Sequence, residues 1–350
     1  MIIVHLLWSL TTGGTESMLA DIANIQIEFG HKVIVVVVND MIDNNILHRF
    51  DKKCILYFCY RKKGSKTPLP IIKLNYLLWR INPDIVHVHM DGLGKYLFRS
   101  LGHFKMVRTV HSNMGNYKDL NKYDSIFSIS ESVQKNLEHN GFKSEIVYNG
   151  IFIGNIKRRI DISVKTEVCR IVSIGRLEEI KGHHILVEAV HQLDEKGVDG
   201  FCVDIIGDGS ERDKIEALIS KYSLNGKVNI LGLKPRDYIY ENLCNYDIFV
   251  LPSLSEGFGL TLAEAMAAKV PVVTCDLDGP MEVINNGKYG YTFICGDSMQ
   301  LAGVLTEMIH NNKGDINVDE AYEYVSNNFD IYKTVQKYCE KYVELIHCKL

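Results

Sequence analysis

The stretch YDIFVLPSLSEGFGLTLAEAMAAKVPVV, residues 246–273, decides the fold class that we expect for this chain. It begins with a short apolar run that ends near Leu251, continues through a glycine-containing loop, and enters a helix near Leu260 before a second apolar run. A strand, a helix and another strand in this order predict a parallel sheet with a right-handed crossover. In such sheets ligands bind beyond the carboxyl ends of the strands, so we expect a site in the loop after Leu251.

Strand-length apolar runs alternate with helix-length segments along nearly the whole chain. The runs occupy residues 1–8, 32–38, 54–58, 84–90, 105–111, 125–130 and 145–149, and then 169–175, 201–207, 227–232, 246–252, 270–276 and 289–294. Because the pattern restarts at residue 169, we predict the α/β class, with two doubly wound, Rossmann-like domains facing a central cleft. The expected parts are an N-terminal domain (1–155), a polar, basic linker (156–167) and a C-terminal domain (168–326), with a helical stretch at the end.

The composition excludes several classes of protein. Hydrophobic residues make up 46% and charged residues 23% of the 350 positions, which is typical of a globular protein. No apolar run reaches the roughly 18 residues of a membrane-spanning helix, and we expect MIIVHLLWSL to form a first strand rather than a signal peptide. Nine cysteines without a C-x-x-C pair indicate reduced thiols, not disulfides or structural zinc. We therefore expect a cytoplasmic protein.

The charge is distributed unevenly between the two halves. Residues 1–165 carry 22 Lys and Arg against 14 Asp and Glu, whereas residues 166–350 carry 17 against 29. A basic half indicates a solvated face or an anionic partner, and among partners we favour a membrane surface or a phospholipid-linked substrate over nucleic acid. Membrane association would make the protein peripheral at the inner face. The basic residues concerned are Lys52, Lys53, Arg61, Lys62, Lys63 and Lys66, with Lys105, Arg108, Lys118 and Lys122.

Glycines and cations follow the first strand of each expected domain. Gly13 and Gly14 precede a helix, where exposed amides suit an anion, although a plain tight turn has the same pattern. The G-x-G-x-x-G fingerprint of a nicotinamide site is missing there. In GRLEEIKG, residues 175–182, Arg176 and Lys181 are placed to hold a diphosphate. The alternative is a surface pair neutralised by the two glutamates between them.

The loop between Leu251 and Leu260 is the strongest signal of a site. Glu256 and the glycines at 257 and 259 come just before the helix, and Glu264 follows about one turn inside it. Helix-start amides suit phosphate, and two carboxylates can accept hydrogen bonds from separate hydroxyls of one sugar-containing ligand. The alternatives, a helix cap and a solvated glutamate, leave the glycines unexplained.

Histidines mark a further candidate in the first domain. His111 ends the strand in TVHSNMG and is expected to face the cleft, although a lone histidine is more often structural. His87 and His89 alternate in DIVHVHM like a metal pair, but no third ligand is evident in the sequence, so we favour packing within the strand.

These motifs together resemble the retaining GT-B glycosyltransferases of family 4, also called group 1. The resemblance rests on Glu256 with Glu264, on the EGFGL loop and on the Arg176–Lys181 stretch. Supporting motifs cover nearly the whole chain: Gly13-Gly14, His111, SISES at 128–132, YNGI at 148–151 and GDGSER at 207–212. The resemblance implies a nucleotide-diphosphate sugar in the second domain, a glycan or lipid-linked acceptor at the first, and a last helix over 327–350 that packs back on the first domain.

The resemblance also implies a role for each matching residue. Arg176 and Lys181 would hold the diphosphate, and Glu256 with the amides of Gly257, Phe258, Gly259 and Leu260 would hold the sugar and phosphate. Glu264 would bind the ribose hydroxyls. Gly14 would approach the phosphate from the facing domain, and His111 would contact the donor sugar. The resemblance implies transfer with retention of configuration by front-side displacement. No nucleophile is evident on the donor's reacting face.

We expect no cofactor and no metal, although the chain holds one D-x-D, Asp276-Leu277-Asp278. The loop DLDGPMEVI departs from the family pattern of two glycines before a glutamate, so we assign its residues no role. The alternatives are a nucleotide-sugar epimerase or hydrolase on the same fold and a non-catalytic sugar-binding relative. A nicotinamide dehydrogenase is the weakest alternative.

Overall fold

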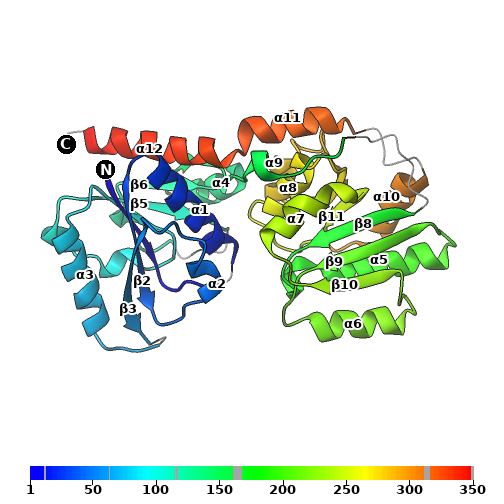
Figure 1. The fold of residues 1–350 in the computed structure, drawn as a ribbon, viewed down its shortest axis with the longest axis horizontal. Helices are drawn as coiled ribbons and strands as arrows, with labels where there is room; N and C mark the ends of the chain where they lie inside the picture. Colours follow the sequence, from blue (N-terminus) through cyan, green and yellow to red (C-terminus); the bar gives the residue numbers. More distant parts are fainter. Residues whose placement is uncertain are drawn as a thin grey trace. The chain divides into compact units, whose positions relative to one another are not determined.

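The computed structural model describes residues 1–11, 13–62, 64–113, 115, 117–160, 168–310 and 316–347. The chain forms two compact units: unit 1 comprises Met1–Gly150 and the residues from Ile331 onward, and unit 2 comprises Ile151–Asp330. Each unit has one parallel sheet with helices on both faces (Figure 1), and the predicted α/β class with two doubly wound domains is confirmed. Each run predicted as a strand contains one.

The described part of the expected linker, 156–167, is not a separate connection but belongs to unit 2. Residues 161–167 lie outside the described residues, and residues 156–160 pack in unit 2. The Arg159 guanidinium donates to the carboxylate of buried Asp247 at 2.8 Å, and the Lys157 amide donates to the Tyr240 carbonyl at 2.9 Å. These contacts fix the segment on unit 2, because its basic side chains find partners there.

Unit 1 has a seven-stranded sheet in the order β3-β2-β1-β4-β5-β6-β7, with every pair parallel. Its central strands are buried on both faces, which explains their continuous apolar runs. The strands are β1 (Ile2–Leu7), β2 (Lys32–Asn39), β3 (Ile55–Arg61), β4 (Ile85–Val88), β5 (Lys105–Val110), β6 (Ser125–Ser128) and β7 (Glu145–Ile146).

Among the described residues, five α-helices belong to unit 1. Leu19, Ala20 and Ala23 of the first helix pack on alternate valines of β2 in one hydrophobic cluster. The fourth helix begins at a Ser130 cap, whose hydroxyl accepts from the Val133 amide at 3.2 Å. The helices are α1 (Gly14–Glu28), α2 (Asn44–Leu47), α3 (Leu69–Ile81), α4 (Glu131–His139) and α12 (Ile331–His347), with 3-10 turns at Gly94–Tyr96, Arg99–Leu101 and Leu120–Lys122.

The last helix, α12, packs on unit 1 through buried tyrosines. Tyr338 and Tyr342 are fully buried, and their hydroxyls bond to Thr109 Oγ1 at 2.9 Å and to His87 Nδ1 at 2.6 Å. At the start of the helix, Thr334 Oγ1 donates to the Tyr148 carbonyl at 2.9 Å. A hydroxyl buried with a partner avoids the desolvation cost of an unpaired polar group, so these contacts hold α12 in one register.

Unit 2 has a six-stranded parallel sheet in the order β10-β9-β8-β11-β12-β13. Its core lies between this sheet and the helices on both faces, with Ile171, Val203 and Val250 among the fully buried members. The strands are β8 (Cys169–Ile174), β9 (Phe201–Ile206), β10 (Val228–Gly232), β11 (Ile248–Leu251), β12 (Val272–Cys275) and β13 (Tyr291–Phe293).

The described part of unit 2 contains seven α-helices. They are α5 (His183–Glu195), α6 (Arg212–Lys221), α7 (Arg236–Asn242), α8 (Leu260–Ala267), α9 (Asp278–Val283), α10 (Ser298–His310) and α11 (Val318–Asn328), with 3-10 turns at Ile153–Asn155, Glu179–Lys181 and Leu243–Asn245. Within the described part of the chain, every helix is too short or too polar to cross a bilayer.

Candidate functional site

Two glycines in unit 2 bring the loops after three neighbouring strands into contact. At Gly182 (φ +65°), a Cβ would lie 2.0 Å from the Pro252 carbonyl oxygen, so the loop after β8 touches the loop after β11. At Gly207 (φ +154°), a Cβ would lie 1.8 Å from the Gly175 carbonyl oxygen, which joins the loops after β9 and β8. Only glycine allows both the backbone angle and the close approach. The result is a compact surface at the carboxyl ends of these strands.

The predicted cations lie on the loop that follows β8, and each has a carboxylate partner. Arg176 is about half exposed, and its Nη1 donates to Glu178 Oε1 at 2.6 Å. Lys181, in the 3-10 turn before α5, donates through Nζ to Glu256 Oε2 at 2.5 Å. The pairing of Arg176 with Glu178 matches the surface alternative considered for the sequence. Lys181 instead reaches across to the loop after β11, because Gly182 brings the two loops together.

Glu256 is held by two donors, Lys181 and Ser253. Its side chain is 16% exposed, and the same Oε2 atom lies 3.5 Å from Ser253 Oγ, which donates to it. A carboxylate held by an ammonium group and a hydroxyl keeps one preferred orientation. Glu256 and Lys181 therefore form one fixed polar unit, whereas Arg176 is free to exchange its exposed partner at little cost.

The loop after Glu256 leads into α8 as predicted. Gly259 precedes the helix with φ +100°, a backbone angle that favours glycine. The Phe258 side chain is buried and contacts the Phe329 ring edge to face, so only its backbone can serve a ligand. The first amides of an α-helix have no acceptor within the helix and carry partial positive charge. In α8 the Leu262 and Ala263 amides donate to the Gly259 carbonyl at 3.1 and 3.2 Å, which leaves the amides of Leu260 and Thr261 for a ligand. This end of α8 thus suits a phosphate or a sugar oxygen.

Glu264 lies inside α8 and is mostly buried. The Tyr240 hydroxyl, from α7, donates to Glu264 Oε1 at 3.3 Å. The bond orients the carboxylate from the protein side, as expected of a group that holds hydroxyls of a ligand. Sequence spacing predicts the position of Glu264 but not its partner.

A pocket of about 170 Å³ adjoins Arg176 and was not predicted from the sequence. It is formed by the residues that follow β8, β9 and β10, including Gly207, Asp208 and Leu233, and its lining is mainly apolar. The sequence signal for it is weak, because Leu233 and Ile239 resemble ordinary core residues. A flat apolar group attached to a phosphate held by Arg176 would fit such a pocket.

The segment DLDGPMEVI, to which the sequence assigns no role, packs against the backbone of the Glu256 loop. A Cβ at Gly279 would lie 2.7 Å from the Gly257 carbonyl carbon and oxygen, so Gly279 permits α9 to approach the Glu256–Gly257 backbone. Asp276 Oδ1 accepts from the Cys295 amide at 2.8 Å, which ties the first D-x-D carboxylate to the backbone. Gly279 is a site-shaping residue that the sequence did not identify, because its neighbour is known only from the fold.

In unit 1, the carboxyl ends of β1, β4 and β5 bring four histidines together. His5 and His87 are paired in register on β1 and β4, His89 follows β4, and His111 follows β5. Ligand atoms of His5, His87 and His89 lie within 4.8 Å of one another, so the third histidine missing from the sequence pattern is His5. Both ring nitrogens of each of these three already have hydrogen-bond partners, which favours packing over metal binding.

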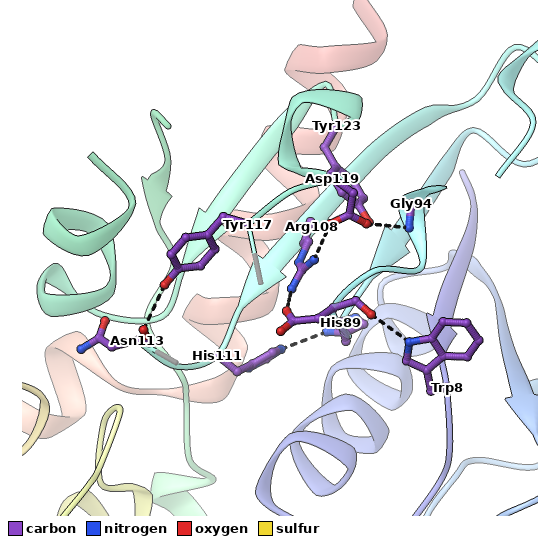
Figure 2. Close-up of polar contacts among 10 residues, drawn as sticks. Trp8, His89, Gly94, Arg108, His111, Asn113, Tyr117, Asp119 and Tyr123 are labelled. Atoms are coloured by element: carbon purple, nitrogen blue, oxygen red, sulfur yellow. Dashed lines mark hydrogen bonds and ion pairs between the residues drawn. The ribbon is translucent and has the colours of Figure 1, made fainter. Parts of the chain in front are cut away.

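An ion-pair cluster lies beside the histidines (Figure 2). The Arg108 guanidinium is buried and pairs with Asp91 and with Asp119, whose Oδ1 lies 3.4 Å from Nη1. The Trp8 indole donates to the Asp91 carbonyl at 2.8 Å. Arg108 therefore does not contribute to a basic surface, in contrast to its inclusion among the basic residues of the sequence. Lys63, another of those residues, lies outside the described residues.

At the start of α1, a glutamate covers the glycine turn. A Cβ at Gly13 would lie 2.5 Å from Glu16 Oε2, and Thr11 Oγ1 donates to Glu16 Oε1 at 3.2 Å. Space is open around Gly14, where a Cβ would meet nothing within 4 Å. An anion approaching Gly14 would encounter the Glu16 carboxylate, which already balances the positive end of this helix.

Two protein-family models match the chain. The model described as glycosyl transferases group 1 matches residues 156–328, and the model described as glycosyltransferase family 4 matches residues 12–153. The first match covers most of unit 2 and the second most of unit 1.

Named relatives cover different shares of the chain. A Campylobacter jejuni protein, N-acetylgalactosamine-N,N'-diacetylbacillosaminyl-diphospho-undecaprenol 4-alpha-N-acetylgalactosaminyltransferase, is 26% identical over 88% of this chain and 90% of its own length. The lipopolysaccharide core biosynthesis glycosyltransferase LpsE of Rhizobium meliloti is 26% identical over 69% and 70%. A Salmonella typhimurium protein named for colanic acid biosynthesis, WcaL, is 33% identical over 45% of this chain, which spans only 41% of that relative.

Solved structures share the fold. A glycosyltransferase from Rickettsia africae has a TM-score of 0.83 at 22% identity and covers 99% of both chains. Anabaena Alr3699/HepE, solved in complex with UDP and glucose, has a TM-score of 0.81 at 22% identity and covers 98% of this chain and 100% of that one. With the two family models spanning residues 12–153 and 156–328, these matches show that the chain belongs to the glycosyl transferases group 1 family and has the GT-B fold.

Proposed function

We propose that this protein is a retaining glycosyltransferase that moves a hexose-type sugar from a nucleotide-diphosphate sugar to a hydroxyl of a glycan or lipid-linked glycan. The observation that carries the proposal is the surface at the carboxyl ends of β8 and β11, where Arg176, the Lys181–Glu256 pair and the start of α8 gather. Two cations and the amides at a helix start suit a diphosphate, and the carboxylates suit sugar hydroxyls.

Each group has a role in this proposal. Arg176 exchanges Glu178 for the diphosphate, and Lys181, oriented by Glu256, neutralises charge that develops on the leaving phosphate. Glu256 and the amides from Gly257 to Leu260 hold the sugar and its phosphate. Two further groups complete the proposed donor site: Glu264 on the ribose hydroxyls and the apolar pocket beside Arg176 on the base. The family resemblance assigns His111 to the donor sugar.

Transfer proceeds by front-side displacement, without a metal or cofactor. The bond between the anomeric carbon and the leaving phosphate oxygen breaks as the acceptor hydroxyl bonds to that carbon on the same face. Because attack and departure occur on the same face, the configuration is retained. The leaving phosphate takes the hydroxyl proton, so charge is balanced. Preorganised cations supply the main stabilisation of this transition state, because they need no reorganisation as the phosphate leaves.

The names of the relatives support a role in surface polysaccharide or glycoconjugate synthesis. The Campylobacter jejuni relative is named for a sugar transfer to an undecaprenol-linked glycan, and the Rhizobium meliloti relative for lipopolysaccharide core synthesis. A lipid-linked acceptor for this chain would place unit 1 at an anionic membrane surface on the cytoplasmic side.

The test of transfer is a donor screen with the purified protein. UDP-, GDP-, ADP-, dTDP- and CMP-linked sugars are incubated with a lipid-linked disaccharide, and the products are analysed for transfer and anomeric configuration. We expect transfer from one donor class, and Arg176→Ala should lower turnover about a hundredfold, a loss of about 3 kcal/mol.

Glu178→Gln is the matched control, because it removes only the competing carboxylate from Arg176. It should retain or slightly improve nucleotide binding. Wild-type turnover in Arg176→Ala would contradict the assignment, and consumption of the donor without a transferred sugar would indicate a hydrolase or an epimerase.

Exposed apolar side chains on α3 support the membrane part of the proposal. Leu69, Ile72, Tyr76 and Trp79 follow one another at helical spacing, and each is more than half exposed. With Phe98, the last three line a hollow of about 260 Å³. Aromatic residues of this kind favour the interface between headgroups and acyl chains.

Positive charge accompanies this apolar face. Lys73 and Arg80 are exposed on the same helix. Lys95, which precedes Phe98 in the sequence, is also exposed. Basic side chains next to membrane-facing aromatics bind anionic lipid, at roughly 1 kcal/mol per charge. An anionic bilayer therefore matches both the apolar and the charged groups of α3.

Vesicle sedimentation tests this association. We expect binding to phosphatidylglycerol vesicles, weak binding to phosphatidylcholine vesicles, and a roughly tenfold loss for Tyr76→Ser with Trp79→Ser. The control is Met299→Ser, which removes an equally exposed apolar side chain from unit 2. Equal binding of the α3 variant and the wild type would contradict α3 as the membrane face.

A further inference from the structure

A chain of hydrogen-bonded side chains connects the interior of unit 1 to His111. Gln26 of α1 is fully buried, and its Oε1 lies 2.7 Å from His5 Nε2. His5 Nδ1 lies 3.0 Å from His89 Nε2, and His89 Nδ1 lies 3.4 Å from His111 Nε2. Figure 2 shows the outer end of this chain, where the His111 ring meets His89. Three imidazoles in series thus lead outward from one amide.

The direction of every bond follows from that amide. A carbonyl oxygen only accepts, so His5 must carry its proton on Nε2, and a neutral imidazole then leaves Nδ1 as an acceptor. His89 therefore donates from Nε2 and accepts at Nδ1. His111 in turn donates from Nε2, which leaves a lone pair on its Nδ1.

Burial keeps these rings neutral. Burial lowers the pKa of His5 to about 4, and burial with the charge of nearby Arg108 lowers the pKa of His111 to about 4. Burial, with the neighbouring His87, His5, His111 and Arg108, lowers the pKa of His89 well below its usual value. A ring that accepted a proton here would also place two N–H donors face to face and interrupt the series of hydrogen bonds from Gln26 to His111.

A second set of bonds holds the chain in place. The His87 and His89 rings are tilted by 32° with their centroids 4.0 Å apart, and the two nitrogens of His87 bond to Tyr342 of α12 and to Thr109 of β5. The positions of the His89 and His111 rings are therefore fixed by sheet and helix together. Among the described residues, His111 Nδ1 has no hydrogen-bond partner, so its lone pair is available to a ligand.

We propose that Gln26, acting through His5 and His89, holds His111 as the Nε2–H tautomer and so presents Nδ1 as an acceptor for one hydroxyl of the donor sugar. Gln26, His5 and His89 are positioning residues, and His111 alone touches the substrate. The contact with the sugar rests on the proposed glycosyltransferase function, whereas the tautomer does not. A donor whose hydroxyl at that position is replaced by hydrogen would lose the contact.

Nitrogen-15 NMR of the histidine-labelled full chain tests the tautomer directly. In the wild type we expect a pyrrole-type Nε2 and a pyridine-type Nδ1 for His111, assigned with a His111→Gln spectrum. Gln26→Leu removes the acceptor and should convert His111 to a mixture of tautomers. Gln26→Glu restores an acceptor at the same place and should restore the single tautomer.

Asn75→Leu is the control for the loss of a buried amide in unit 1. Asn75 is buried and bonds to the carbonyls of Ile71 and Tyr96, away from the histidines, so this variant should keep the wild-type tautomer. A His111 that carries its proton on Nδ1 in the wild type, or that is unchanged in Gln26→Leu, would overturn the relay. Loss of the single tautomer in Gln26→Glu would show that Gln26 donates to His5, which also overturns the proposal.

Kinetics with the donor found in the screen separate the relay from the function. We expect Gln26→Leu to lower kcat/KM about tenfold, the effect of one lost hydrogen bond to the substrate, and Gln26→Glu to recover most of it. If His111→Ala turns over at the wild-type rate while the tautomer still follows Gln26, the contact with the sugar is wrong and the relay stands. If the tautomer and kcat/KM both respond as expected, the relay and the contact with the sugar are both supported.

Discussion

Unit 1 and unit 2 arrange six strands in the same order, yet they place opposite chemistry at the carboxyl ends of those strands. Unit 1 buries neutral imidazoles there, with a paired arginine beside them. Unit 2 places glycines there, with cations on the loops that the glycines bring together. The same topology can therefore carry a rigid hydrogen-bonded core or a surface that presents cations.

The difference in chemistry between the two units follows from the groups that pack next to the strand ends. In unit 1, α1 and α12 bring Gln26 and Tyr342 against the sheet, so histidines at these positions gain partners on both nitrogens. In unit 2, Gly182 and Gly207 leave no side chain between adjacent loops, and Lys181 reaches Glu256 across the contact. Each of the following predictions tests one side of this contrast.

The largest expected effect is a loss of unit 1 stability in acid. Burial lowers the folded-state pKa of His5 and of His111 to about 4, so between pH 6.5 and 4 the unfolded chain binds more protons than the folded chain. This contribution is complete above pH 6.5 and decreases as the pH falls to about 4. Each such histidine costs roughly 3 kcal/mol by the end of that interval. His87 and His89 shift in the same direction.

Hydrogen exchange at pH 7, 6 and 5, corrected for the intrinsic rate, measures this effect in each unit. In unit 2, burial lowers the pKa of only one described histidine, His183, to about 4. Peptides of β1, β4 and β5 should therefore lose protection at a higher pH than peptides of β8 and β11. Earlier loss in unit 2 would contradict the contrast.

Gly182→Ala should have the next largest effect. A Cβ there would lie 2.0 Å from the Pro252 carbonyl oxygen at a positive φ, so we expect a loss of about 3 kcal/mol in the free energy of unfolding of unit 2. Gly197→Ala is the control, because Gly197 has a similar φ of +71° but open space around it. Its cost should be about 1 kcal/mol. Chemical denaturation of both variants measures the difference, and equal costs would show that the loop contact is unimportant.

Tyr240→Phe should have the smallest effect. It removes the hydroxyl that donates to Glu264 at 3.3 Å, without changing the volume of the buried ring. We expect about 1 kcal/mol of lost nucleotide affinity, a few-fold rise in Kd, because Glu264 then lacks one orienting bond. Isothermal titration calorimetry with the nucleotide that binds in the screen measures it. An unchanged Kd would separate Glu264 from the nucleotide site.

Much of the fold could be predicted from the sequence, because both sheets are parallel and buried. Buried strands are apolar along their whole length, so runs such as Val33–Val38 identify strands without an alignment. The loop from Glu256 to Leu260 was likewise predictable, because its glycines serve the local backbone. Gly259 has the positive φ that such a turn before a helix requires.

Groups that act through distant partners could not be predicted in this way. The alternation of His87 and His89 is visible in the sequence, but His5 becomes their neighbour only through the register of β1 with β4. Arg108 looks like a surface charge until Asp91 and Asp119 are placed beside it. Contacts of this kind join residues far apart in the chain, and local pattern carries no information about them.

We propose that unit 2 holds the nucleotide of the donor, and hydrogen exchange of the full chain tests this placement. Exchange is measured with UDP, GDP, ADP, dTDP or CMP, in the wild type and in Arg176→Ala. We expect one nucleotide to slow exchange in residues 175–182 and 256–264, and this protection to be lost in Arg176→Ala. Protection confined to unit 1, or unchanged in Arg176→Ala, would contradict it.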